Sequence, residues 1–223
     1  TLSDWSTLAK LPFSIAGRVT AISAGRTLDS QPERRRRERL FLEVTRREAS
    51  ARDMPPTGWN STPLATGDNA ELWSVSPDGS DLRLVTIGTN PTLSPNGRAL
   101  AHSVRTVDNV FEIRLLALDG SQTVTRLPCQ GPLRDVRGLA WSPGGRYLAY
   151  ARDLGLGFDI VVLHLDTGVE TAVTGAFAPE LYPQFLPSTS LDRAFDGIVF
   201  STRAEDSGGS GWTLQFVEFR GQL

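Results

Sequence analysis

The sequence predicts an all-β fold, a β-propeller of about four blades, each a four-stranded antiparallel sheet. A tight turn recurs as Ser94-Pro95-Asn96-Gly97 and Ser142-Pro143-Gly144-Gly145, with its prolines 48 residues apart, and each turn precedes an apolar strand. A period of roughly 40 to 50 residues that holds four short strands is typical of a propeller blade. A further observation is a set of hairpin signals containing Asp and Gly, at 77–79, 119–120 and 166–168.

The strands of each blade are named A to D, from the centre of the ring outward. In the turns between strands A and B, proline fixes the dihedral φ at the second position of the turn. Glycine leaves the backbone dihedrals at the fourth position unrestricted. In the turns between C and D, aspartate and glycine tolerate the positive φ that a short hairpin requires. The A strands are predicted at 18–23, 91–94, 136–141 and 182–186, and the B strands at 40–46, 99–105, 147–152 and 197–203. The C strands are predicted at 70–76, 111–118, 158–165 and 212–219, and the D strands at 82–86, 123–127 and 169–174.

The last predicted strand is a C strand, so the fourth blade is expected to lack an outer strand of its own. Residues 6–12 resemble residues 122–128, which contain a predicted D strand, and we expect them to close the ring by pairing with the fourth blade. The chain is then a single domain, with a closing strand at 1–16 and blades at 17–86, 87–127, 128–174 and 175–223. The alternative is a fragment of a six- to eight-bladed propeller. Such a fragment would begin and end at the same strand position within a blade.

Three motifs resemble the TolB-like, WD-like propeller repeats of bacterial envelope proteins. Trp141-Ser142-Pro143-Gly144-Gly145 matches the turn of that repeat, Phe200-Ser201-Thr202-Arg203 matches the end of its strand, and Leu118-Asp119-Gly120 matches its hairpin. The resemblance covers about residues 70–204. It implies an extracytoplasmic binding protein without catalytic activity, and the same repeats also form the lid domain of prolyl-oligopeptidase-like enzymes.

Composition excludes several classes of protein. No apolar run of the 223 residues approaches the roughly 20 that cross a bilayer. A net charge of −2 gives no case for nucleic-acid binding. Cys129 is the only cysteine, which excludes an internal disulfide and a cysteine-bound metal cluster.

Four arginines end the predicted B strands and are candidate partner-binding residues: Arg46, Arg105, Arg152 and Arg203. Arginine binds carboxylates and phosphates through two parallel hydrogen bonds, so these side chains could form a cationic crown on one face of the ring. The alternative is that each arginine braces the loop of its own blade.

Two segments of the first blade are further candidate contact surfaces. The arginine run that contains Arg35 and Arg36 lies between strands A and B, where it could contact anionic lipid headgroups or an acidic partner, or form a solvated loop. The insertion between strands B and C carries Met54 and Trp59 among prolines. An exposed Trp on a long loop suits a protein contact, and the alternative is a loop folded over its own blade.

No enzyme motif is present. The sequence lacks a Gly-x-Ser-x-Gly elbow, a phosphate-cradling loop and a His-Glu-x-x-His helix. We expect His102 to take part in blade packing and His164 to be a surface strand residue, with no metal and no cofactor. The expected function is a non-enzymatic, protein-binding scaffold of the bacterial cell envelope, periplasmic and part of a membrane-associated complex. The alternatives are a carbohydrate- or peptide-processing propeller or its lid domain, and a cytoplasmic location.

Overall fold

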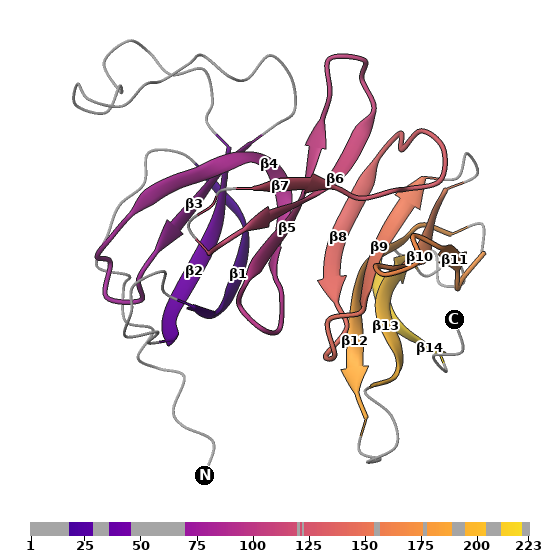
Figure 1. The fold of residues 1–223 in the computed structure, drawn as a ribbon. Coiled ribbons are helices and arrows are strands. Elements are labelled where there is room, and N and C mark those ends of the chain that lie inside the picture. The colour runs from indigo at the N-terminus through magenta and orange to yellow at the C-terminus, as the bar shows by residue number, and fades with distance from the viewer. Residues whose placement is uncertain are drawn as a thin grey trace.

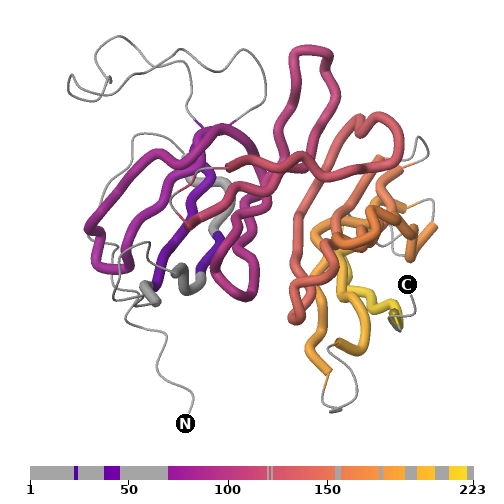
Figure 2. Tube along the Cα trace, viewed as in Figure 1, coloured from indigo at the N-terminus to yellow at the C-terminus, as the bar shows by residue number. Residues whose placement is uncertain are grey.

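The computed structural model describes residues 18–28, 36–45, 70–119, 121, 123–153, 157–175, 178–188, 195–203 and 211–219 (Figure 2). All fourteen elements in these residues are β-strands, and every pairing between them is antiparallel. Among the described residues there is no helix of a length and apolarity suited to spanning a membrane. The all-β prediction is confirmed.

The strands group into four blades along the chain (Figure 1). The first blade contains β1 (Arg18–Leu28), β2 (Arg36–Thr45), β3 (Ala70–Val75) and the first half of β4 (Arg83–Leu93). The second contains the rest of β4, β5 (Ala99–Arg105), β6 (Phe111–Ala117) and β7 (Val124–Arg126). The third contains β8 (Val136–Trp141), β9 (Tyr147–Asp153), β10 (Phe158–His164) and β11 (Glu170–Ala172). The fourth contains β12 (Glu180–Pro187), β13 (Phe195–Arg203) and β14 (Trp212–Glu218).

Strand β4 belongs to two blades. Its first half pairs with β3 as the outer strand of the first blade, and its second half pairs with β5 as the inner strand of the second. The sequence predicts these halves as separate strands at 82–86 and 91–94. In the structure the strand continues between them through a bulge at Asn90, so the first two blades form one continuous seven-stranded sheet.

The blades pack face to face through apolar side chains. Phe41 and Leu72 of the first blade contact Leu100 and Leu116 of the second. A larger cluster joins the second and third blades, with Ile113, Leu139, Leu148, Tyr150 and Leu163 among its members. Between the third and fourth blades, the ring of Tyr147 meets Phe195 and Phe219 edge-on, at centroid distances of 5.7 and 6.3 Å. Each interface therefore uses one face of each neighbouring sheet.

The four described blades form an open arc and are not closed into a ring (Figure 1). Among the described residues, the fourth blade has three strands and β14 pairs only with β13. The predicted closing strand at 1–16 lies outside the described residues. The open arc fits a partial propeller, the alternative that the sequence left open.

Candidate functional site

Each inner strand has a shift in its pairing register. The shifts fall between Val19 and Ala21 in β1, Thr89 and Thr92 in β4, Arg137 and Ala140 in β8, and Leu181 and Gln184 in β12. Three of these bulges contain a residue with positive φ, namely Asn90 at 55°, Gly138 at 60° and Tyr182 at 55°. A bulge bends a strand and re-aims its side chains. Sequence reasoning missed this repeat because the three residues share no chemistry.

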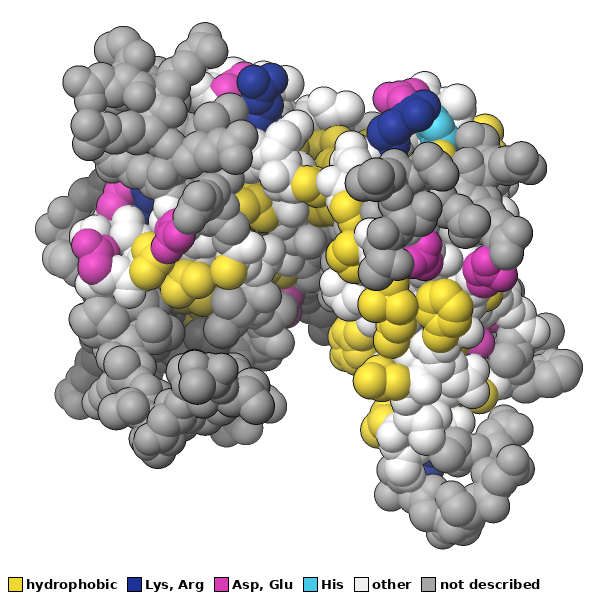
Figure 3. Space-filling view, turned by 90° about the horizontal axis from the view of Figure 1, so that it is seen from below, with side chains coloured by type: hydrophobic (Ala, Val, Ile, Leu, Met, Phe, Trp, Pro, Cys, Tyr) yellow, Lys and Arg dark blue, Asp and Glu magenta, His cyan; other side chains and the backbone are white. Residues whose placement is uncertain are grey.

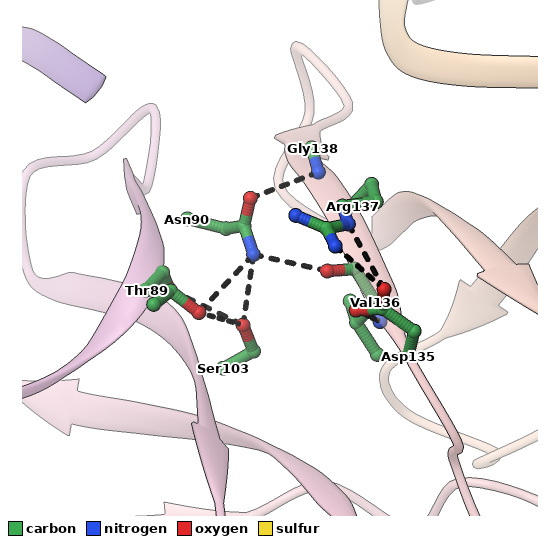
Figure 4. Close-up of polar contacts among 7 residues, drawn as sticks. All are labelled: Thr89, Asn90, Ser103, Asp135, Val136, Arg137 and Gly138. Atoms are coloured by element: carbon green, nitrogen blue, oxygen red, sulfur yellow. Dashed lines mark hydrogen bonds and ion pairs between the residues drawn. The ribbon is translucent and has the colours of Figure 1, made fainter. Parts of the chain in front are cut away.

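Asn90 connects three blades, and Figure 4 shows its side-chain contacts with the second and third. Its backbone N–H donates to Glu43 Oε2 of the first blade at 2.6 Å. Its side-chain amide donates to Ser103 Oγ of the second blade at 3.0 Å and to the Val136 carbonyl of the third blade at 3.1 Å. The Gly138 N–H of the third blade donates to Asn90 Oδ1 at 3.1 Å. The side-chain amide thus joins the second blade to the third, and the backbone N–H joins it to the first.

The next bulge along the arc is joined to the fourth blade by close backbone packing. A Cβ atom at Gly138 would lie 2.7 Å from Tyr182 Cα, so no side chain fits there. Tyr182 itself is 56% exposed. Beside Gly138, Arg137 Nη2 lies 2.7 Å from Asp135 Oδ2 in a partly exposed ion pair (Figure 4). The inner strands of neighbouring blades are thus joined by hydrogen bonds at Asn90 and by close backbone packing at Gly138.

The predicted crown arginines lie in different environments. The Arg152 side chain is 12% exposed, with its Nη1 2.6 Å from Glu170 Oε2 and its Nη2 donating to the Gln130 carbonyl. The Arg105 guanidinium lies 5.9 Å from the ring centre of Phe111 on the next strand of its blade. Arg203 is exposed at the end of β13. The contacts of Arg152 and Arg105 within their own blades fit the bracing interpretation.

The other sequence candidates lie mostly outside the described residues. These are Arg46, Arg35, Met54 and Trp59. Arg36 begins β2, so the arginine run extends into a strand, and nothing is described of its side chain.

A buried polar cluster surrounds Arg152. The Tyr150 hydroxyl donates to Glu170 Oε1, and the Gln130 N–H donates to Glu170 Oε2 at 3.0 Å. Cys129 Sγ lies 3.8 Å from the Tyr150 hydroxyl. Burial raises the pKa of the Cys129 thiol to about 11, so the thiolate that would act as a nucleophile is rare at neutral pH. The cluster braces the third blade.

Both histidines are buried. Burial lowers the pKa of His102 to about 4, so its ring is neutral at physiological pH. His164 Nδ1 accepts hydrogen bonds from the N–H groups of Asp166 at 3.2 Å and Thr167 at 3.3 Å. The prediction of His164 as a surface residue is wrong, because its ring caps the hairpin turn and packs edge-on against Tyr147 at 4.9 Å.

The outward face of the fourth blade is apolar and exposed. Trp212, Leu214 and Phe216 alternate along β14 and are 55%, 77% and 52% exposed. Their neighbours on β13 are Arg203, Ser201 and Val199. In the view from below, hydrophobic side chains gather over the half of the molecule that the last two blades form (Figure 3). Sequence reasoning predicts the strand at 212–219 but not that its face is open.

Neither the models of known families nor curated protein sequences match this chain. Among solved structures, TolB from Acinetobacter baumannii is 17% identical with a TM-score of 0.53, over 68% of this chain and 36% of that chain. The putative TolB from Agrobacterium tumefaciens is 18% identical with a TM-score of 0.55, over 81% of this chain and 57% of that chain. A puromycin hydrolase S511A mutant complexed with PGG is 12% identical with a TM-score of 0.53, over 90% of this chain and 27% of that chain.

The chain spans less than two thirds of the length of these proteins. At such identities the likeness concerns the fold alone. The fold of this chain is that of a TolB-like β-propeller.

Proposed function

We propose that this chain is a non-enzymatic scaffold that binds a protein through the open end of its arc of blades. The observation that carries the proposal is the exposed apolar stripe of Trp212, Leu214 and Phe216 on β14. Contiguous apolar surface of this kind marks interaction sites in soluble proteins. Tryptophan in particular is enriched among the residues that dominate binding energy.

The rigidity of the support favours binding. The sheet that carries the stripe packs on the third blade through Phe185, Ile198 and Phe200, and Gly138 locks the two inner strands together. Side chains held on such a support lose little freedom when a partner binds, so more of the contact energy appears as affinity.

The polar chemistry of the described residues supports a non-enzymatic role. His164 caps a turn, His102 is buried and neutral, and the Cys129 thiol is held in its protonated form. Glu170 is occupied by Arg152 and Tyr150. These four side chains are thus committed to packing and bracing.

The likeness to TolB structures supports a location outside the cytoplasm, in the bacterial cell envelope, as part of a membrane-associated complex. A second candidate is the propeller part of a peptidase, which the likeness to puromycin hydrolase favours. Hydrolysis of aminoacyl amides or short peptides by the purified chain would favour that candidate.

The test is capture of envelope proteins by the tagged chain after mild cross-linking. Leu214→Asp places a charge in the centre of the stripe, and we expect it to remove most of the captured protein. Val107→Asp is the matched control, because Val107 is fully exposed on a hairpin of the second blade. Equal capture by the original chain and both variants would contradict the proposal.

A further inference from the structure

We propose that β14 binds an extended peptide segment of a partner protein as an outer strand of the fourth blade, and that a carboxylate of this segment pairs with Arg203. The inference rests on the proposed function and names the kind of segment that the open end of the arc accepts. A segment bound in this way adds a strand to the edge of a sheet, and its main-chain hydrogen bonds supply much of the affinity.

The first three blades show the place that this segment would take. In each of them the third strand pairs with an outer strand: β3 with β4, β6 with β7, and β10 with β11. Among the described residues, β14 pairs only with β13, so its other edge has no strand beside it there. The N–H and C=O groups along an edge of this kind are a template for pairing with another strand.

Leu214 holds the same place in its blade as Ile113 and Ile160 hold in theirs. Each lies two residues after the residue that pairs with the end of the second strand of its blade. The Ile113 carbonyl accepts a hydrogen bond from the Leu127 N–H at 2.9 Å, and the Ile160 carbonyl accepts one from the Val173 N–H at 2.9 Å. By this repeat, the Leu214 carbonyl faces the open edge and can accept the same hydrogen bond from a peptide.

The outer strands of the second and third blades indicate which side chains fit. In both, a threonine is followed two residues later by an apolar residue, as Thr125 by Leu127 and Thr171 by Val173. Leu127 is 6% exposed, and Val173 packs on the apolar cluster between the third and fourth blades. A partner strand with this pattern places its apolar residue beside Leu214, where the two side chains form a cross-strand pair.

Two blades also pair an arginine of the second strand with a carboxylate at the outer strand. In the first blade, Arg39 on β2 pairs with Asp81, two residues before β4. In the third blade, Arg152 on β9 pairs with Glu170 on β11, and this pair reaches across β10. An outer strand in these blades therefore brings both main-chain pairing and a counter-charge.

Arg203, the last residue of β13, is exposed and has no such counter-charge among the described residues. It lies opposite Trp212, so a strand added to β14 would lie two strands from Arg203, as β11 lies two strands from β9. The peptide residue opposite Trp212 comes two residues after the one opposite Leu214. A carboxylate at that position lies on the same face as Arg203 and can pair with its guanidinium.

The probe is a fluorescein-labelled peptide with an amidated C-terminus and the sequence VQTAVTE. It is residues 169–175 of this chain with Glu170→Gln and Gly175→Glu, so that its second valine aligns with Leu214 and its glutamate with Trp212. The measurement is fluorescence anisotropy with the purified full chain at up to about 300 μM. Since one strand buries far less surface than a standard interface, we expect a dissociation constant of about 10 to 100 μM.

Two control peptides separate main-chain pairing from side-chain contact. VQTAPTE has proline in place of the residue whose N–H would donate to the Leu214 carbonyl, and we expect it to bind at least tenfold more weakly. VQTAVTQ lacks the carboxylate and should bind several-fold more weakly. Val107→Asp is the matched control variant and should leave the binding of VQTAVTE unchanged. Equal binding of VQTAVTE and VQTAPTE would overturn the addition of a strand.

A charge exchange tests the pairing with Arg203. Arg203→Glu should weaken the binding of VQTAVTE several-fold, because it places like charges together. The peptide VQTAVTK should bind this variant more tightly than it binds the original chain. Circular dichroism checks that the variant is folded. If the variant and the original chain bind both peptides equally, the pairing with Arg203 is wrong.

A chain that binds none of the peptides overturns the inference and leaves the edge of β14 to the predicted closing strand at residues 6–12. In that case, loss of captured envelope proteins in Leu214→Asp would leave the proposed function standing, with the partner on the apolar stripe and not on the edge. If no peptide binds and Leu214→Asp does not change capture, both the inference and the proposed function are wrong.

Discussion

The outward faces of the first and fourth blades both carry apolar side chains, but in opposite environments. Leu42 on β2 is 1% exposed, whereas Leu214 on β14 is 77% exposed. Both residues belong to strands in which apolar side chains alternate along one face. Alternating apolar residues therefore predict a strand with one apolar face. Whether that face is buried depends on the rest of the molecule.

The same contrast holds for charged residues. Arg152 and Arg203 both lie near the ends of B strands, in β9 and β13. Arg152 is mostly covered and paired with Glu170, whereas Arg203 is exposed beside Trp212. The difference follows from neighbouring elements, because β11 supplies Glu170 to the third blade and the described fourth blade has no strand in that place.

The largest expected effect tests this pair of arginines. Arg152→Met should lower the free energy of unfolding by about 3 to 5 kcal/mol, because Glu170 would stay buried without its counter-charge. Arg203→Met should change it by less than about 0.5 kcal/mol. Urea denaturation measures both values. Equal effects would show that the two arginines have the same environment.

The next test compares the two outward faces directly. Leu42→Ala should lower the free energy of unfolding by about 3 kcal/mol, since it removes buried methyl groups and leaves a cavity. Leu214→Ala should lie within about 0.5 kcal/mol of the original chain. Thermal and urea unfolding provide the comparison. A neutral Leu42→Ala would mean that the face of the first blade is as open as that of the fourth.

A third test uses pH to probe a covered blade. Burial, with a smaller effect of the Arg114 charge, lowers the pKa of His102 from 6.5 to about 4. The unfolded chain therefore binds a proton at higher pH than the folded chain does, and stability is lost as pH falls from 6.5 to about 4. The loss from this group reaches at most about 3 kcal/mol.

The variant His102→Leu should remove this part of the acid sensitivity. The measurement is the difference in unfolding free energy between the original chain and the variant at each pH. A difference that does not change between pH 7 and pH 4 would contradict the burial of His102 as the cause.

The smallest expected effect concerns the covered side of the fourth blade. Burial raises the pKa of Glu180 above its ordinary 4.5, a hydrogen bond with Thr174 opposes this, and the Asp159 charge adds to it. As pH rises from the ordinary pKa of Glu180 to its higher pKa in the folded chain, Glu180 loses its proton first in the unfolded chain. Ionisation of Glu180 therefore lowers the stability of the folded chain. Glu180→Gln should therefore be more stable than the original chain at neutral pH and lose that gain near pH 4. A gain that is the same at both pH values would rule out ionisation as its cause.

Much of the fold was predictable, because the information lies in local turns and alternating strands. The turns at Pro95 and Pro143 mark strands β5 and β9, where the structure has them. The merger of two predicted strands into β4 was missed, since nothing in residues 87–90 signals that the strand continues.

The candidate site was less predictable. The bulges at Asn90, Gly138 and Tyr182 were missed because bulges depend on the strand beside them. Of the crown arginines, Arg105, Arg152 and Arg203 lie at or near strand ends, and Arg46 lies outside the described residues. The partners of Arg152 and Arg105 come from other strands, which the sequence does not show. His164 was placed at the surface because the sequence does not show which turn its ring caps.

By itself, the sequence determined an all-β chain with a blade repeat, since proline, glycine and the alternation of apolar residues act over a few neighbouring positions. Only the tertiary structure decided which faces are covered, which arginines are buried and where the arc is open. Burial depends on residues that are distant in sequence, such as Glu170 for Arg152 and Phe195 for Tyr147.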